Sequence, residues 1–197
     1  MERYIICIAQ FILRRHRLFL RIVQWLAKCG YWLYILYGII EWCRPGRLQD
    51  KLKRRQTLWY CLFSVIVGSL LSLLTGWCWH RKRPFAAHAD IDPLIAHRNN
   101  ASFPSNHSMN AMAVAITLLR CGNPAGLFFL PFAILIGASR VLCGVHYVTD
   151  VVGGFLFGMV SAVLVGCTKK STDLAQKSNW YYHVGATILK AWYQRKV

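Results

Sequence analysis

The chain has 197 residues, which is enough for one domain. It carries 24 Lys and Arg against 7 Asp and Glu, a formal net charge of +17, yet 56% of its residues are hydrophobic and 14% are aromatic. A soluble domain of this size cannot bury so much apolar surface, and a disordered chain is poor in aliphatic and aromatic residues. The composition is typical of a membrane protein with cationic loops. We therefore expect an all-α, polytopic bundle of membrane helices.

The first segment, residues 1–17, has an apolar run followed by basic residues, which is the reverse of a cleaved signal peptide. We expect it to form an amphipathic helix at the membrane interface. A first span is predicted over Ile22–Ile40, where Lys28 must either snorkel or face the bundle interior. The loop Arg44–Arg55 follows. It holds the densest cluster of basic residues, and the positive-inside rule places it in the cytoplasm.

Four further spans bring the predicted total to five, and all five fall in a membrane domain over residues 18–168. The span before residue 121 reaches membrane length only if its helix begins near Ser105. In the last span, the Gly154-x-x-x-Gly158 spacing would let another helix approach closely. A basic tail, residues 169–197, is expected at the cytoplasmic interface. The four spans cover residues 56–80, 108–119, 121–139 and 151–168.

Alternation of the five spans places residues 81–107, and the turn that follows Arg140, on the outer side of the membrane. Three short polar segments lie on this side. They are Arg83-Pro84-Phe85, Pro104-Ser105-Asn106-His107, and Ser139-Arg140 followed by His146 and Asp150.

These residue types suit a site for a phosphate group. Arg83 and Arg140 supply guanidinium groups, which stay charged and can each donate two parallel hydrogen bonds to the oxygens of a phosphate. Ser105 follows a proline and precedes a helical run, so it is expected at the helix N-cap. The free N–H groups of Asn106 and His107 at that helix start, with the Ser105 hydroxyl, are expected to bind the same anion.

Three residues are candidates for catalysis. His146 and Asp150 are four residues apart, so the carboxylate can hold one imidazole nitrogen while the other attacks phosphorus. His107 is the candidate acid for the leaving oxygen and then the base for water. Further candidates for contact with substrate flank these segments, and no metal or other cofactor is expected. The flanking residues are His80, His88 and His97, with the Asp90-x-Asp92 pair as a weaker candidate for a divalent cation.

At these residues the sequence resembles the type-2 phosphatidic acid phosphatase (PAP2) superfamily, whose signature is K-x6-RP, then PSGH, then SR-x5-H-x3-D. The resemblance covers residues 59–166 and implies a haloperoxidase-like bundle of five to six helices. Within the superfamily, RPFAAH (83–88) and ASFPSNH (101–107) resemble the bacitracin-resistance type of undecaprenyl-diphosphatase. That resemblance implies a metal-independent enzyme of the bacterial cytoplasmic membrane, with its site on the outer face. It implies hydrolysis of undecaprenyl diphosphate to undecaprenyl phosphate for reuse in peptidoglycan synthesis.

The sequence departs from the family pattern at three positions. Gly76 stands where the signature has lysine, and Lys82 or Arg81 is available to supply that charge from a different position. Asn106 replaces the common glycine but keeps the backbone N–H. Val148 replaces a frequent proline. None of these changes removes the nucleophile, its carboxylate partner or the acid.

Three other functions remain open at this point. The enzyme could act on another lipid, such as phosphatidylglycerophosphate, phosphatidate or lipid A. A non-catalytic membrane protein with an anion-binding vestibule would use the same cations but would carry polar residues inside its spans. A membrane-anchored nucleic-acid binder would use the loop Arg44–Arg55, although a role in topology explains that loop.

Overall fold

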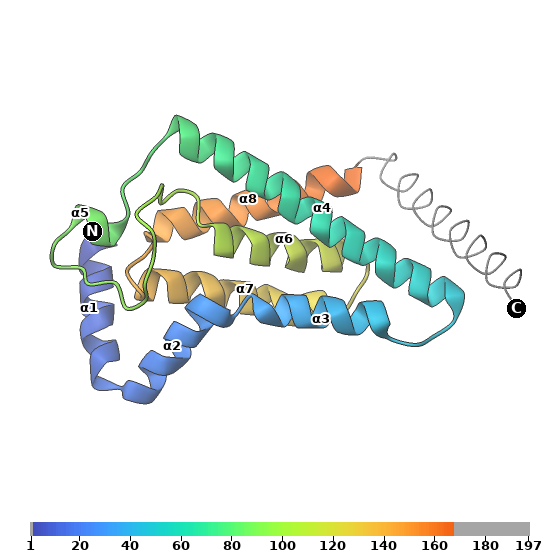
Figure 1. The fold of residues 1–197 in the computed structure, drawn as a ribbon, viewed down its shortest axis with the longest axis horizontal. Helices are drawn as coiled ribbons and strands as arrows, with labels where there is room; N and C mark the ends of the chain where they lie inside the picture. Colours follow the sequence, from blue (N-terminus) through green and yellow to red (C-terminus); the bar gives the residue numbers. More distant parts are fainter. Residues whose placement is uncertain (1, 168–197) are drawn as a thin grey trace, which may run out of the picture.

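The structure is a computed structural model, and it describes residues 2–167 (Figure 1). These residues form helices and no strand, which confirms the predicted all-α bundle. Three short N-terminal helices and the four-residue helix Pro84–Ala87 bring the described total to eight, more than the five to six that the resemblance implied. The helices are α1 (Glu2–Arg15), α2 (Arg17–Cys29), α3 (Trp32–Cys43), α4 (Leu48–Cys78), α5 (Pro84–Ala87), α6 (Asn106–Arg120), α7 (Ala125–Leu142) and α8 (Val148–Cys167).

Helix α6 is the centre of the bundle and packs against α4, α7 and α8. Small buried residues on α6, among them Ala113 and Ala115, let its neighbours approach closely. A Cβ on Gly154 would lie 2.7 Å from the Ser105 carbonyl oxygen, and a Cβ on Gly158 would clash with the backbone of α6. The predicted close approach at this glycine pair is therefore confirmed, and it brings the beginnings of α6 and α8 together.

Three of the described helices, α4, α7 and α8, are long and apolar enough to cross a membrane. They match the spans predicted over 56–80, 121–139 and 151–168. Their outer faces carry exposed leucines, such as Leu73 at 68% and Leu127 at 69% exposure, where lipid would surround the bundle. Helix α6 has 15 residues and lies mostly buried among these spans.

The single span predicted over Ile22–Ile40 is wrong, because α2 ends at Cys29 and α3 begins at Trp32. Gly30 lies at the break. A Cβ there would sit 3.1 Å from a side-chain carbon of Ile136, so the missing side chain lets the junction pack on α7. Helix α2 has 13 residues and buries only Val23 and Ala27. It is therefore too short and too amphipathic to cross a bilayer alone.

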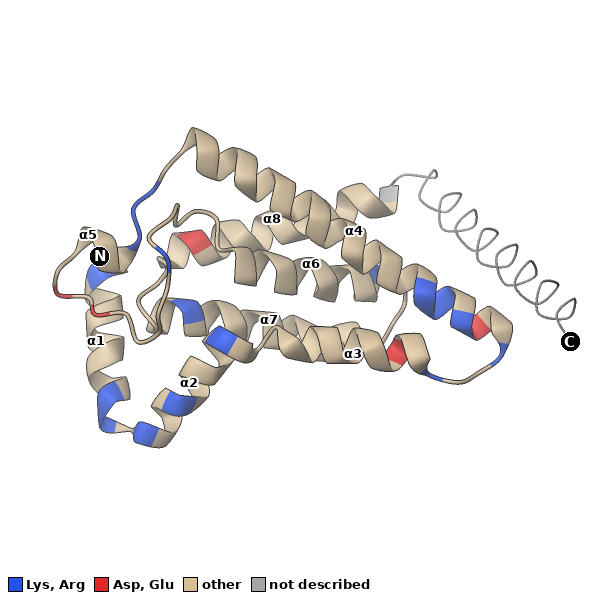
Figure 2. Cartoon of the chain, in the orientation of Figure 1, with Lys and Arg blue, Asp and Glu red and all other residues tan. Residues whose placement is uncertain are grey.

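The charged residues gather at the two ends of the bundle (Figure 2). The basic loop Arg44–Arg55 lies at the beginning of α4, and Arg81–Arg83 follow the end of the same 31-residue helix. Helix α1 lies at the second end, where it buries Ile6, Gln10 and Leu13. The predicted interfacial tail, residues 169–197, lies outside the described residues.

The seven described cysteines are all free of disulfide bonds. Cys61 and Cys143 are buried, whereas Cys43, Cys78 and Cys121 are exposed at helix ends.

Candidate active site

The three polar segments meet at one end of the bundle. The backbone N–H of Ser105 donates to the carbonyl of Asp150 at 3.0 Å, which ties the start of α6 to the start of α8. The side chain of Arg83 donates to the carbonyl of Val145 at 2.8 Å, which ties the loop after α4 to the turn before α8. Hydrogen bonds across more than 40 residues of sequence thus assemble a single site.

His146 lies in the turn before α8 and is only 2% exposed. Its Nε2 atom is 3.0 Å from Nη1 of Arg83. Because a guanidinium can only donate, Nε2 is the acceptor, and the ring proton belongs on Nδ1. Nδ1 faces Oδ2 of Asp150 at 3.6 Å, which is longer than a hydrogen bond. The two side chains therefore face each other as predicted, but at a distance too long for a hydrogen bond.

Burial lowers the pKa of His146 to about 4. The nearby cations Arg83 and Arg140 act in the same direction, and Asp150 acts in the opposite one. The imidazole is therefore neutral at physiological pH, with an unprotonated Nε2.

Asp150 is fully buried, and its carboxylate is held on both oxygens. Oδ2 accepts from the backbone N–H of Tyr147 at 2.9 Å and from the hydroxyl of Ser102. Oδ1 accepts from Nη1 of Arg81 at 2.6 Å. Sequence reasoning missed Ser102, for which no motif gives a signal, and named Arg81 only as a possible source of charge.

Arg83 is buried and its guanidinium is almost fully used by the protein. Nε and Nη2 donate to Oδ1 of Asn100 at 3.1 and 2.8 Å, and Nη1 lies between Val145 and His146. Burial lowers the pKa of Arg83 to about 10, so the group remains a cation at neutral pH. Its position is fixed before any ligand arrives.

Arg140 is 2% exposed and leaves two donors free. Nη1 donates to the carbonyl of Ala27 at 2.7 Å, whereas Nε and Nη2 have no hydrogen-bond partner. A buried cation with unpaired donors is costly unless an anion completes it. Arg140 is thus the clearest mark of an anion site at this end of the bundle.

Ser105 is the N-cap residue of α6, as predicted, and is fully buried. Its hydroxyl contacts the hydroxyl of Ser108 at 2.9 Å instead of capping a backbone N–H. The Oδ1 atom of Asn106 accepts from the Ser72 hydroxyl of α4. Asn106 is therefore oriented by α4, a contact that the sequence did not signal.

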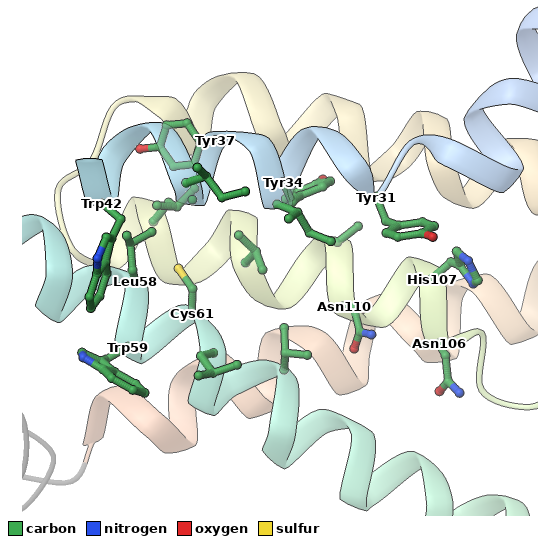
Figure 3. A pocket seen from close by; sticks show the side chains of 18 of the residues that line it. Tyr31, Tyr34, Tyr37, Trp42, Leu58, Trp59, Cys61, Asn106, His107 and Asn110 are labelled. Carbon is green, nitrogen blue, oxygen red and sulfur yellow. The ribbon is translucent and has the colours of Figure 1, made fainter. Parts of the chain in front are cut away.

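Burial lowers the pKa of His107, in the first turn of α6, to about 3, and the nearby Arg140, His146 and Arg83 act in the same direction. Its ring meets the edge of the Tyr31 ring with centroids 5.9 Å apart (Figure 3). Tyr31 belongs to the junction between α2 and α3, so the break in the predicted first span places an aromatic side chain at the site.

The three flanking histidines differ in their distance from the site. The His97 ring lies 6.1 Å from that of His146, edge to face, and burial lowers the pKa of His97. The His88 ring lies 6.4 Å from Tyr147. His80 is exposed. His97 is thus the flanking histidine placed nearest to the His146 ring.

Helix α1 contacts the same end of the molecule through Glu2. Oε1 of Glu2 accepts from the backbone N–H of Thr149 at 2.9 Å, at the N-terminus of α8. Oε2 pairs with Arg81 at 3.2 Å. The first helix therefore supports the arginine that holds Asp150.

The two acidic residues considered for a divalent cation are paired with α1 instead. Asp90 accepts from Arg3 at 2.9 Å, and Asp92 accepts from Arg14 at 2.8 Å. Within residues 2–167 no group of three or more His, Cys, Asp or Glu side chains is arranged to hold a metal ion.

Comparison with known proteins identifies the family of this chain. The sequence profile of the PAP2 superfamily matches residues 57–171. The Bacitracin transport permease protein BcrC of Bacillus licheniformis is 28% identical over 144 residues, which are 73% of this chain and 68% of that protein. Undecaprenyl-diphosphatase BcrC of Bacillus subtilis is 34% identical over 112 residues, or 57% of this chain. The match spans 55% of the length of that second protein.

Solved structures show the same fold. The PAP2-type phosphatidylglycerolphosphate phosphatase from Bacillus subtilis superposes with a TM-score of 0.58 and 26% identity, covering 83% of this chain and 82% of that chain. Phosphatidylglycerophosphatase B of the same organism is 39% identical over 108 residues, 45% of this chain and 49% of that protein. The relatives thus include phosphatases of different lipids. The family profile, the fold and the converged motifs lead to one conclusion: this chain is a membrane protein that belongs to the PAP2 superfamily of phosphatases.

Proposed function

We propose that this enzyme hydrolyses undecaprenyl diphosphate to undecaprenyl phosphate and inorganic phosphate. The reaction recycles the lipid carrier of peptidoglycan synthesis and confers resistance to bacitracin. The observation that carries the proposal is the setting of His146. Its Nε2 atom lies 3.0 Å from the Arg83 guanidinium, and its Nδ1 atom faces Asp150. A phosphoryl group that takes over the Nη1 donor of Arg83 frees the Nε2 electron pair of the ring and lies next to it.

In the first half-reaction, Nε2 of His146 attacks the terminal phosphorus. The bond from phosphorus to the bridging oxygen breaks, and its electron pair leaves with that oxygen. The bound diphosphate places negative charge beside His107 and so favours its imidazolium form, which takes a proton from solvent and donates it to the leaving undecaprenyl phosphate. Asp150 stabilises the positive charge that develops on the ring as the N–P bond forms.

The second half-reaction returns the enzyme to its starting state. His107, now neutral, removes a proton from water, and the resulting hydroxide attacks the phosphohistidine. The N–P bond breaks and inorganic phosphate leaves. Arg83, Arg140 and Ser105, with the N–H groups of Asn106 and His107, hold the phosphoryl oxygens in both transition states.

The choice of lipid is supported by the two BcrC relatives and by the 83–88 and 101–107 sequence runs. We place the enzyme in the bacterial cytoplasmic membrane with this site on the outer face. The support is the basic loop Arg44–Arg55, which lies at the opposite end of α4 from the site. Undecaprenyl diphosphate and the surrounding lipids are the partners that the proposal requires, and it involves neither nucleic acid nor a metal cofactor.

The test is phosphate release from undecaprenyl diphosphate by the purified protein in detergent with EDTA present. We expect release by the wild type and none by His146→Ala, with normal release by the control His16→Ala, because His16 is exposed and lies between α1 and α2, outside the three site segments. With substrate labelled on the terminal phosphate, we expect an acid-labile label on the wild-type protein. Release by His146→Ala would rule out the proposed nucleophile.

A second candidate is hydrolysis of phosphatidylglycerophosphate, because a phosphatidylglycerolphosphate phosphatase shares this fold at 26% identity. The two candidates use the same phosphate chemistry and differ in the lipid. Rates on both purified lipids, measured side by side at equal surface concentration, decide between them.

A further inference from the structure

A groove of about 900 Å³ runs between α3 and α4, with α6 forming its floor (Figure 3). Its walls come from Tyr34 and Tyr37 of α3, Leu58 and Leu62 of α4, and Val114 of α6. None of the residues that line it is Asp, Glu, Lys or Arg. A cavity of this size and lining accommodates an apolar ligand of moderate size.

The polar end of the groove is the start of α6. Asn106 and His107 line it there, and both belong to the anion site described above. Asn110, one turn further along α6, also lines the groove, and its Oδ1 atom is buried without a hydrogen-bond partner. The groove is therefore continuous with the phosphate site and becomes apolar with distance from it.

Tyr34 and Tyr37 form one wall of the groove, the tyrosine wall, and hydrogen bonds to the rest of the bundle hold this wall in place. The Tyr34 hydroxyl donates to the carbonyl of Phe129 at 3.1 Å, and the Tyr37 hydroxyl accepts from Asn123 at 2.8 Å. Both hydroxyls are thus occupied by the rest of the bundle. The rings face the groove as rigid apolar surfaces, which lowers the entropic cost of binding a flexible chain.

The far end of the groove is narrowed by two indoles. Trp42 of α3 and Trp59 of α4 meet edge to face with centroids 6.4 Å apart, and the Arg55 guanidinium lies 4.8 Å from the Trp42 ring centroid. A second cavity, of about 380 Å³, is lined by Lys53 and Arg120 and shares no residue with the groove. The apolar groove that begins at the phosphate site is therefore separate from this second cavity.

We propose that this groove binds the first isoprene units of a single polyprenyl chain and selects that chain over two-chain phospholipids. The inference rests on the proposed function, whose substrate joins a diphosphate to one polyprenyl chain. A lipid of this kind places its headgroup at His107 and its chain along the tyrosine wall. A diacylglycerol lipid needs room for a second chain beside the first.

Gly38 of α3 offers a direct test. It lines the groove, and a Cβ added there meets no atom within 4 Å, so the first atom of a larger side chain has open space at the groove wall. The variant is Gly38→Phe. The control is Leu127→Phe on α7, which adds the same ring at a position 69% exposed and outside the groove.

The measurement is kcat/KM for undecaprenyl diphosphate divided by kcat/KM for isopentenyl diphosphate, which has the same headgroup and one isoprene unit. In Gly38→Phe we expect this ratio to fall by roughly tenfold or more, mainly through KM, because the added ring excludes a buried part of the chain. In Leu127→Phe we expect the wild-type ratio. An unchanged ratio in Gly38→Phe would overturn the proposal.

Two further arms separate this proposal from the proposed function. If the wild type releases no phosphate from undecaprenyl diphosphate, the proposed function is wrong, and this result is independent of what the groove binds. A polyprenyl diphosphate with a photoreactive group on an early isoprene unit then tests the groove through binding alone. We expect adducts on α3 and α6 of His146→Ala. Adducts confined to the outer faces of α7 and α8, or equal labelling by a diacyl probe, contradict the inference.

Discussion

Arg81 donates through Nη1 to Oδ1 of Asp150 at 2.6 Å, and its guanidinium lies 4.1 Å from the centroid of the Tyr147 ring. The family signature has a lysine at the position of Gly76, and Arg81 lies five residues further along the chain. The arginine is bound to the carboxylate that faces His146, the proposed nucleophile, so we expect Arg81 to act on the reaction by positioning Asp150.

We expect Arg81→Ala to lower kcat by about tenfold to a hundredfold. The loss leaves one oxygen of a fully buried carboxylate without its donor, which costs about 1–3 kcal/mol. Arg81→Lys should recover part of the activity, because it restores the charge but not the planar fork. The control is Lys82→Ala, since Lys82 is the neighbouring cation and is exposed. Equal activity in Arg81→Ala and the wild type would show that Asp150 is held without this contact.

The depressed pKa of His146 determines the acid side of the pH profile. Protonation takes the Nε2 electron pair, so activity is lost as pH falls through the pKa of about 4, rather than near the ordinary value of 6.5. We expect kcat/KM to show no loss attributable to this ring between pH 5 and 7, as measured in a pH series with a constant detergent. A loss centred near pH 6.5 and assigned to this ring by NMR would contradict the effect of burial.

The same shift makes folding stability depend on pH. The unfolded chain binds a proton at His146 near pH 6.5, whereas the folded chain binds it only near pH 4. Between these values the unfolded state holds more protons, so the free energy of unfolding should fall as the pH is lowered. Thermal unfolding at pH 7 and pH 5 measures this, and His146→Phe should show a smaller difference than the wild type.

The unpaired donors of Arg140 predict strong anion binding. Orthovanadate mimics the phosphoryl transition state, and we expect Arg140→Lys to weaken its inhibition and to lower kcat by about a hundredfold to a thousandfold. A lysine keeps the charge but cannot present Nε and Nη2 together. Titration of activity with vanadate provides the measurement. An unchanged inhibition constant would mean that these donors do not meet the ligand.

The contact between α6 and α8 predicts a stability effect at Gly154. A methyl group there would press against the Ser105 carbonyl at 2.7 Å, so Gly154→Ala should destabilise the fold by about 1–3 kcal/mol. Gly38→Ala is the matched control, because its methyl group meets no atom within 4 Å. Melting temperatures in one detergent compare the two. A smaller loss at Gly154 than at Gly38 would contradict the packing described here.

Much of the site could be predicted because its chemistry requires particular residue types. Few other functions require, in this order, two guanidinium groups, an N-cap serine and a histidine four residues before an aspartate. The long spans could be predicted from hydropathy. The contacts that hold these groups could not be predicted. Ser102, Asn100 and Ser72 are ordinary polar residues whose role depends on which segment lies opposite.

The error over Ile22–Ile40 has a similar origin. Hydropathy measures whether a segment tolerates lipid, and both α2 and α3 contain apolar stretches. The break depends on Gly30 packing against Ile136 of α7, more than a hundred residues away in the sequence. The only local sign of this tertiary contact in the sequence is a single glycine. The position of Tyr31 beside His107 follows from the same contact.

The bond from Glu2 to the backbone of Thr149 has a consequence for biosynthesis. It joins the beginning of α1 to the beginning of α8, so Arg81 and the Asp150 carboxylate that it holds reach their full set of contacts only when both helices are in place. Because Asp150 itself lies in the first turn of α8, we expect a nascent chain to show no phosphatase activity until α8 has been inserted into the membrane.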